Sequence, residues 1–168
     1  MVVFLCGPSL LLADKNPGAA LRKRLKDALE VEGFEVVLGE DDGLEDVRLT
    51  ETGGYAHDNE LEFIRRECGA IVLIADSVGS FCELGLFVHW LANNPDRTCD
   101  FVLIADEKYK DDKSYFNEGP ANAAEHFGRT LYVEFATADI KPILKRLRGR
   151  RSTQLFSGHG RPAGRVKS

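Results

Sequence analysis

The run Ala70–Ala75 (AIVLIA) decides the fold, because it is apolar at every position. A strand with one face in water alternates apolar and polar residues, whereas a strand covered by helices on both faces is apolar throughout. The run has the length of a strand, and Gly69 before it and Asp76 after it mark its ends. It therefore predicts the central strand of a parallel sheet.

Similar apolar runs lie on both sides of this strand, and segments with apolar residues three and four positions apart separate them. The predicted strands are residues 2–6, 34–38, 101–105 and 130–135, and the predicted helices are residues 17–32, 55–68, 80–92, 121–127 and 137–148. This alternation predicts an α/β fold: a five-stranded parallel sheet of flavodoxin-like order 2-1-3-4-5, with helices on both faces in three layers. Ligands of such sheets bind beyond the carboxyl ends of the strands, here near Gly7, the loop after Leu38 and residues 76–83.

Length and composition exclude several classes of protein. A length of 168 residues fits one domain, and 43% hydrophobic with 29% charged residues is not the composition of a disordered chain. No apolar run approaches the roughly 20 residues that a membrane-spanning helix needs, and the first residues lack the basic start of a secretion signal. We therefore expect a cytoplasmic protein without membrane contact. The four cysteines lack the spacing of metal ligands, so we expect reduced thiols, no metal and no cofactor.

Charge divides the chain into an acidic body and a basic end. From Lys141 onward there are nine basic residues and no acidic ones, so all 27 acidic residues lie before it. We predict a catalytic domain over residues 1–149 and a flexible basic tail over residues 150–168. Such a tail either binds nucleic acid or an acidic partner, or stays solvated against its own acidic body. Apart from Leu155-Phe156, the tail lacks interleaved aromatic residues, which favours the second alternative.

The segment 76–85 (DSVGSFCELG) contains the residues that point to chemistry. One interpretation is structural: Ser80 and Glu83 have the spacing of a capping box, in which each side chain binds a backbone amide at the helix start. That does not explain Gly79 or Gly85, because Gly inside a helix costs about 1 kcal/mol relative to Ala. Glycine would let a ligand approach the backbone, and an ionised Glu83 near a helix N-terminus is a candidate nucleophile. The residues alone leave both interpretations open.

Residues 79–85 (GSFCELG) resemble the G-T-x-x-E-x-G segment of the nucleoside 2-deoxyribosyltransferase superfamily, whose Glu attacks C1′ of the sugar. Residues 4–9 are similar to the first strand and turn of that family, residues 57–64 to its second-helix segment and Asn122 to its late polar position. The resemblance implies that Glu83 is the nucleophile, and that the protein is a homodimer in which a neighbouring subunit completes each site. The substrate-binding residues that it implies are Gly7, Ser9, Ser77, Gly79, Ser80 and Asn122.

Within this superfamily, the sequence is most similar to the 2′-deoxynucleoside 5′-monophosphate N-glycosidases. That branch carries a Ser six positions before the nucleophile, in contact with the 5′-phosphate, and here the residue is Ser77. The Asp of other members would repel a dianionic phosphate, whereas a hydroxyl donates a hydrogen bond to it. Ser9 could supply a second hydroxyl, but an ordinary turn serine is an equal alternative. After Pro8 the sequence lacks the arginine and glycines of the branch's phosphate loop.

A second carboxyl group would protonate the leaving base. In the family it lies on the second helix; here Glu60 fits the His-x-x-acid spacing and Asp58 is the alternative. The predicted activity is therefore cleavage of the base–sugar bond of a (deoxy)nucleoside 5′-monophosphate or a related nucleotide, through a glycosyl-enzyme intermediate.

Two other functions stay open. In NAD glycohydrolases of the Toll/interleukin-1 receptor type, the catalytic Glu also follows the third strand of a flavodoxin-like sheet, and Ser77 to Glu83 match part of its pattern. A non-catalytic nucleotide-sensing module would keep the pocket, and would use the basic tail to bind nucleic acid or an acidic partner.

Overall fold

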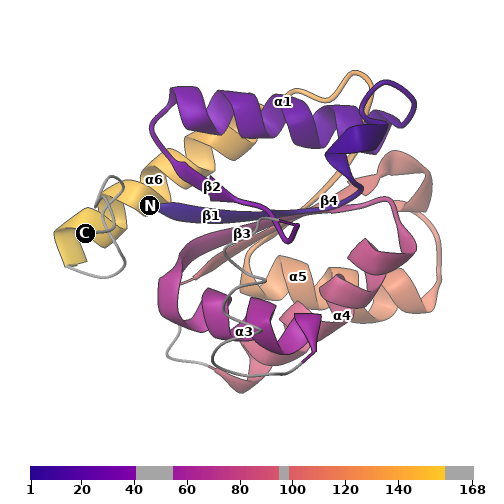
Figure 1. Cartoon of the computed structure of the whole chain (residues 1–168). Coiled ribbons are helices and arrows are strands. Elements are labelled where there is room, and N and C mark those ends of the chain that lie inside the picture. Colours follow the sequence, from indigo (N-terminus) through magenta and orange to yellow (C-terminus); the bar gives the residue numbers. More distant parts are fainter. Residues whose placement is uncertain (41–54, 95–98, 158–168) are drawn as a thin grey trace.

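Five strands form the centre of the protein: β1 (Val2–Cys6), β2 (Glu35–Val37), β3 (Cys68–Ala75), β4 (Asp100–Asp106) and β5 (Arg129–Val133). The computed structural model describes residues 1–40, 55–94 and 99–157 (Figure 1). All strand pairs are parallel, and the order β2-β1-β3-β4-β5 confirms the predicted topology. Ile71 of β3 lies opposite Phe4 of β1 on one side and Phe101 of β4 on the other, so the predicted central strand is central.

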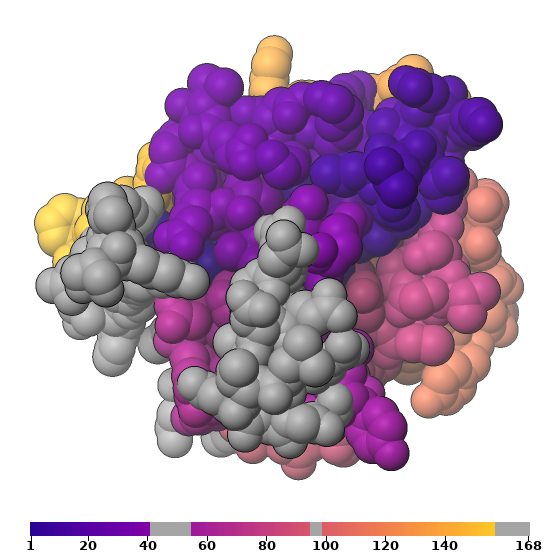
Figure 2. Space-filling view, viewed as in Figure 1, coloured from indigo at the N-terminus to yellow at the C-terminus, as the bar shows by residue number. Residues whose placement is uncertain are grey.

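Helices cover both faces of the sheet, as predicted. They are α1 (Pro17–Val31) and α6 (Lys141–Ser157) on one face, and α3 (Ala56–Glu67), α4 (Val78–Asn93) and α5 (Asn122–Phe127) on the other. Successive residues of β3 point to opposite faces, so Ile71 and Leu73 pack under α3, α4 and α5, while Val72 and Ile74 pack under α1 and α6. Figure 2 shows the two helical layers from outside, α1 in purple above and α3 and α4 in magenta to pink below.

The first turn of α4 differs from the predicted one. The helix begins at Val78, because the Oγ atom of Ser77 accepts a hydrogen bond from the backbone N–H of Ser80 at 3.2 Å. Ser77 is therefore the N-cap, and the predicted N-cap role of Ser80 is wrong. The Ser80 hydroxyl instead binds back to the carbonyl and amide of Ser77, which completes a capping box of two serines.

The helix α6 is longer than predicted. The basic residues and Gly149 indicated an end near Arg148, and residues 150–157 were expected to be flexible. Instead the helix continues to Ser157, because its last turns contact the body of the protein. The buried side chain of Gln154 donates a hydrogen bond to the carbonyl of Gly69 at 3.3 Å, and the guanidinium of Arg151 stacks 4.2 Å from the ring centre of Phe34. These tertiary contacts override the local stop signal.

Several basic side chains of α6 form ion pairs with the acidic body. Arg146 binds both carboxylate oxygens of Asp100 at 2.8 Å, and Arg150 contacts the same carboxylate at 3.1 Å. Arg148 lies 3.4 Å from Glu32. In the described part of the basic segment, these contacts agree with the alternative in which it leans on its own body. Residues 158–168 lie outside the described residues.

The connections between the main elements contain short helices. The predicted charged loop 106–119 includes a 3-10 turn (Glu107–Tyr109) and the start of a π-helical turn, η4 (Asn117–Ala121). Another 3-10 turn, η1 (Leu10–Leu12), follows β1. Most of the predicted loop between residues 39 and 54 lies outside the described residues. Among the helices that the structure describes, none has the length and apolar character needed to cross a bilayer.

Candidate active site at the carboxyl ends of the strands

Glu83 lies on α4, one turn after the serine cap. Its Oε2 atom is buried, and no group among the described residues donates a hydrogen bond to it. Because the cap consists of Ser77 and Ser80, the interpretation of Glu83 as a capping residue is wrong. A buried carboxylate oxygen without a partner is costly, which is why such groups are found mainly where a ligand or reaction requires them.

The second carboxyl group of the site belongs to Glu60 on α3. Burial and, second, the negative charge of Glu83 raise the pKa of Glu60 to about 7. A Cβ atom placed on Gly39, just after β2, would lie 3.2 Å from the Oε1 atom of Glu60. Glu60 therefore lies beside the carboxyl end of β2 and close enough to Glu83 for the two carboxyl groups to interact electrostatically. Their catalytic roles stay predictions.

A buried arginine lies at the carboxyl end of β1. Arg22 of α1 is 1% exposed, and its guanidinium donates hydrogen bonds to the carbonyls of Leu5 and Pro8 at 2.7–3.2 Å. Its two terminal nitrogens also bind both carboxylate oxygens of Glu40, at 2.8 and 2.9 Å. Neither Arg22 nor Glu40 was predicted as a site residue. The available signal was an arginine beside Leu21 on the apolar side of an amphipathic helix, where a charged residue needs a buried partner.

Electrostatic effects connect the two carboxyl groups, Glu60 and Glu83, to the end of β1. Burial raises the pKa of Glu83, the charge of Arg22 acts against this shift, and the charge of Glu40 adds to it. At the end of β1, burial and then the charges of Glu83 and Glu60 raise the pKa of the Cys6 thiol. The site thus combines side chains from β1, α1, α3 and α4 with one that follows β2.

Asp58, the alternative second acid, has a different environment. Its Oδ2 atom accepts a hydrogen bond from the backbone N–H of Tyr55 at 3.3 Å, at the start of α3. The side chain is half exposed and lies 3.6 Å from the Nε2 atom of His57. These contacts are typical of a helix cap, and of the two candidates it is Glu60 that interacts with Glu83.

Ser77, predicted to bind the phosphate, and Ser80, predicted to bind the substrate, both have contacts within the chain. Ser80 is 1% exposed, and its Oγ atom accepts hydrogen bonds from the backbone N–H groups of Asp76 and Ser77. Ser77 is half-buried and caps α4. Gly79 is exposed, with open space where a Cβ would lie. The first turn of α4 therefore presents its backbone to solvent at Gly79.

The other predicted binding residues are spread over a wider area. Gly7 adopts a φ of +145°, and a Cβ atom there would lie 3.1 Å from the carbonyl of Ile74 and 3.5 Å from the Cδ atom of Arg22. It therefore permits the close approach of β1, β3 and Arg22. Ser9 is exposed and accepts a hydrogen bond from the N–H of Leu11 at 3.3 Å, which caps η1. Asn122 is exposed at the start of α5, and no described contact joins it to the carboxylates.

Comparisons with known proteins place this arrangement in a family. Residues 19–161 match the family model of the STM3845 retron effector protein. The chain belongs to this family. The matched range contains Arg22, Glu40, Glu60 and Glu83, while β1 with Gly7 and Ser9 lies before it.

One curated relative of this retron effector family member comes from Escherichia coli. It is provisionally named a retron Ec86 ribosyltransferase/DNA-binding protein, and it is 30% identical over 73 residues. The matched segment covers 44% of this chain and 22% of the relative, so the comparison spans about a fifth of that protein. Neither comparison refers to the nucleoside 2-deoxyribosyltransferase superfamily by name.

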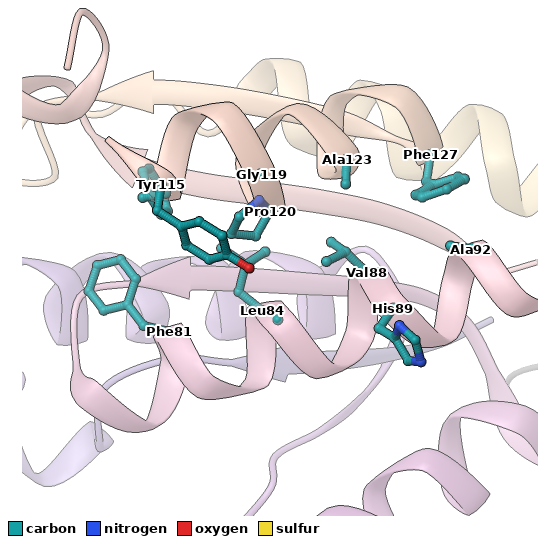
Figure 3. A pocket seen from close by; sticks show the side chains of 12 residues that line it. Phe81, Leu84, Val88, His89, Ala92, Tyr115, Gly119, Pro120, Ala123 and Phe127 are labelled. Atoms are coloured by element: carbon teal, nitrogen blue, oxygen red, sulfur yellow. The ribbon is translucent and has the colours of Figure 1, made fainter. Parts of the chain in front are cut away.

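This retron effector family member also has an apolar groove on the other side of α4. The groove has a volume of about 650 Å³ and lies between α4 and the segment formed by η4 and α5 (Figure 3). The predicted catalytic residues are not among those that line it. Gly85 lines it with open space at its Cβ position, so the helix glycine of the motif faces this groove. The lining residues are Phe81, Leu84, Gly85, Val88, His89, Ala92, Tyr115, Phe116, Gly119, Pro120, Ala123 and Phe127.

Proposed function

We propose that this protein cleaves the N-glycosidic bond of a nucleotide, with Glu83 as the nucleophile and Glu60 as the proton donor and acceptor. The observation that carries the proposal is a pair of half-buried carboxyl groups that interact with each other, in which the charge of Glu83 contributes to a Glu60 pKa of about 7. Glycosidic bonds are commonly cleaved by two carboxyl groups with different protonation states.

The surroundings assign a different role to each carboxyl group. With a pKa of about 7, Glu60 carries a proton in about half of the molecules at neutral pH, which suits a general acid that later becomes a base. Burial raises the pKa of Glu83, and the charge of Arg22 offsets part of this shift in favour of the ionised form; the Oε2 atom of Glu83 has no hydrogen bond within the described chain. An ionised oxygen without a partner is available to attack a carbon atom.

The reaction would follow two steps. In the first, a carboxylate oxygen of Glu83 forms a bond to C1′ while the bond from C1′ to the base nitrogen breaks, and Glu60 gives its proton to the base. In the second, water attacks C1′ and passes a proton to Glu60, and the bond between C1′ and Glu83 breaks, returning its electron pair to the carboxylate. The sugar leaves with retained configuration, and each carboxyl group returns to its starting state.

Two resemblances support this class of chemistry. The motif around Glu83 resembles the nucleophile segment of the nucleoside 2-deoxyribosyltransferase superfamily, and the retron Ec86 relative carries ribosyltransferase in its name. From the superfamily we infer a 5′-phosphate near Ser77 and the exposed backbone of Gly79, and a homodimer in which Asn122 contributes to the partner's site. Binding of nucleic acid or an acidic partner by the basic segment stays a prediction.

NAD is a second candidate substrate, favoured by the excess of carboxyl groups over arginines near Glu83. Among the described residues there, Glu83 interacts electrostatically with Glu60, Glu40 and Arg22, and Glu40 binds the guanidinium of Arg22. A terminal phosphate dianion would be poorly neutralised in that surrounding. The pyrophosphate of NAD distributes two negative charges over two phosphates, and cleavage of the bond between its ribose and nicotinamide would use the same two carboxyl groups.

Product analysis tests the proposal directly. The purified protein is incubated with deoxynucleoside monophosphates, nucleoside monophosphates and NAD, and free base or nicotinamide is resolved by chromatography. We expect base release from at least one substrate, and a loss of at least about 10³-fold in Glu83→Gln, because the nucleophile is removed. His89→Ala, which alters the apolar groove, should keep full activity and serves as the matched control.

Two results would contradict the proposal. Full activity of Glu83→Gln would show that another group attacks the sugar. Thermal stabilisation by a nucleotide, without release of base from any substrate, would indicate the non-catalytic sensing module instead.

A further inference from the structure

The guanidinium of Arg22 is fixed at the carboxyl end of β1 by contacts that do not involve Glu40. Its Nε and Nη2 atoms donate hydrogen bonds to the carbonyl of Leu5 at 3.2 and 2.7 Å, and its Nη1 atom donates one to the carbonyl of Pro8 at 3.2 Å. The side chain of Arg22 is 2% exposed. The guanidinium would therefore keep its place if Glu40 moved away, and a buried cation of this kind needs an anion as its partner.

The side chain of Glu40 has fewer contacts than that of Arg22. Its two carboxylate oxygens accept hydrogen bonds from the Nη1 and Nη2 atoms of Arg22, at 2.8 and 2.9 Å. Among the described residues, Arg22 is the donor that this carboxylate has, and the side chain of Glu40 is 48% exposed. An anion from solvent can thus take the place of the carboxylate without leaving the guanidinium unpaired.

The ion pair lies where a sheet of this topology binds its ligands, because the strand order reverses between β1 and β3. A Cβ atom on Gly7, after β1, would lie 3.1 Å from the carbonyl of Ile74 on β3 and 3.5 Å from the Cδ atom of Arg22. A Cβ atom on Gly39, the residue before the paired glutamate, would lie 3.2 Å from the Oε1 atom of Glu60. The ion pair is therefore close to both the switch point and the proposed general acid.

The charge and shape of the glutamate carboxylate indicate which ligand could replace it. A carboxylate offers two oxygens and one negative charge to the planar fork of a guanidinium, and a phosphate within a pyrophosphate offers the same. Exchange of one for the other leaves the net charge of the site unchanged. A terminal phosphate would instead add most of a second negative charge near neutral pH. The site therefore suits the pyrophosphate of a nucleotide such as NAD.

We propose that Arg22 binds the pyrophosphate of a nucleotide ligand, and that Glu40 occupies this site until the ligand displaces it. The inference deepens the proposed function and rests on it for the choice of a nucleotide as ligand, but binding itself requires no cleavage. It assigns the two residues opposite effects on affinity: Arg22 raises it, and Glu40 lowers it by competing for the guanidinium. With a purely structural ion pair, loss of Glu40 would not tighten binding.

The test uses inorganic pyrophosphate, which contains no glycosidic bond, in mildly acidic buffer, where it carries close to one charge per phosphate. Binding is followed by NMR through the Nε–H signal of Arg22, which is assigned by its absence in Arg22→Lys. We expect pyrophosphate to shift this signal in wild type, and to bind Glu40→Ala about 10-fold more tightly, because the internal competitor is gone. Glu62→Ala is the matched control, since Glu62 pairs with Arg65 and Arg66 on the exposed side of α3, and its affinity should stay within about 2-fold of wild type.

A double variant locates the gain in affinity at the guanidinium. In Arg22→Lys/Glu40→Ala the positive charge is kept but the planar fork is lost, so the gain seen in Glu40→Ala should disappear. Pyrophosphate should also raise the Tm of Glu40→Ala more than that of wild type, because it supplies the missing partner of Arg22. Should Glu40→Ala fold poorly, Glu40→Gln serves instead: it keeps a hydrogen-bond acceptor, and we expect a smaller gain of about 3-fold.

Two results would overturn the inference. One is an Arg22 signal that pyrophosphate shifts neither in wild type nor in the Glu40 variant. The other is an equal dissociation constant in wild type, Glu40→Ala and Glu40→Gln. Neither result depends on catalysis, so binding of pyrophosphate as expected, without release of base from any nucleotide, would contradict the proposed function alone.

Discussion

The two sides of α4 form surfaces of opposite character. Toward α3, Glu83 interacts electrostatically with Glu60 and with the Arg22–Glu40 ion pair, and its Oε2 atom has no partner within the described chain. Toward α5, the same helix lines an open apolar groove of about 650 Å³ (Figure 3). This groove is lined mainly by apolar side chains, and none of the proposed catalytic carboxyl groups lines it. The arrangement of charged groups indicates where a reaction could take place, whereas the size of a cavity does not.

Helical periodicity explains how one helix forms both surfaces. Glu83 and Phe87 are four residues apart and point to one side, whereas Leu84 and Val88 are four residues apart and point toward α5. The two sets are separated by one position in the sequence. A single substitution on α4 should consequently affect one surface without the other, which makes the comparison testable.

The largest effect that sharpens this comparison is expected for Glu60→Gln. Loss of the general acid should lower kcat by about 10²- to 10⁴-fold on a substrate with a poor leaving group. Wild-type activity should fall as pH rises through about 7, because Glu60 loses its proton there, and this limb should be absent in the variant. Both features are measured in pH–rate profiles.

Asp58→Asn is the matched control for that variant. Asp58 caps the same helix on the exposed side, so its substitution should change the rate less than about 3-fold. If Asp58→Asn lowered the rate as much as Glu60→Gln does, the acid role would belong to Asp58. The predicted difference between Glu60 and the exposed Asp58 would then be wrong.

A smaller effect is expected on stability. Because the pKa of Glu60 is raised from 4.5 to about 7 on folding, the folded state binds more protons than the unfolded state between these values. The stability that this group contributes is fully present below pH 4.5 and is lost as pH rises to about 7. Between pH 5 and pH 8 the free energy of unfolding should fall by ~2 kcal/mol more in wild type than in Glu60→Gln.

Urea unfolding at the two pH values measures this difference. Glu62→Gln controls for the removal of a carboxylate from α3, because ion pairs with Arg65 and Arg66 lower the pKa of Glu62. Equal pH dependence in wild type and Glu60→Gln would show that Glu60 is not held in an unfavourable surrounding. Folding would then not raise the pKa of Glu60.

The sequence was sufficient for the fold because its signals are local and agree with each other. The fully apolar run Ala70–Ala75 indicated a strand covered on both faces, and the alternation of strands and helices left few topologies. The end of α6 could not be predicted, because Gly149 indicates a stop locally. The contact between Gln154 and Gly69 that extends the helix joins residues far apart in the chain.

The site was predictable only in part, for a related reason. Glu83 and Glu60 were predicted from a motif and a spacing; in the structure the charge of Glu83 acts on Glu60, and their roles stay predictions. The Arg22–Glu40 pair was not found, because no local pattern connects a helix arginine with a glutamate after the next strand. The serine cap of α4 was misplaced by three residues, since Ser77 and Ser80 both suit the N-cap position.

The smallest effect compares one glycine from each side of the comparison. Gly85→Ala places a methyl group in the open groove, where nothing lies within 4 Å, and removes a helix glycine. It should raise the free energy of unfolding by about 0.5 to 1 kcal/mol and leave kcat unchanged. Gly7→Ala, at the end of β1, should lower the free energy of unfolding and lower kcat. A φ of +145° and the carbonyl of Ile74 at 3.1 Å leave no room for a Cβ atom. Thermal unfolding and base release are measured on both variants. Destabilisation by Gly85→Ala would mean that a contact closes the groove in solution. The two sides of α4 would then no longer differ as described.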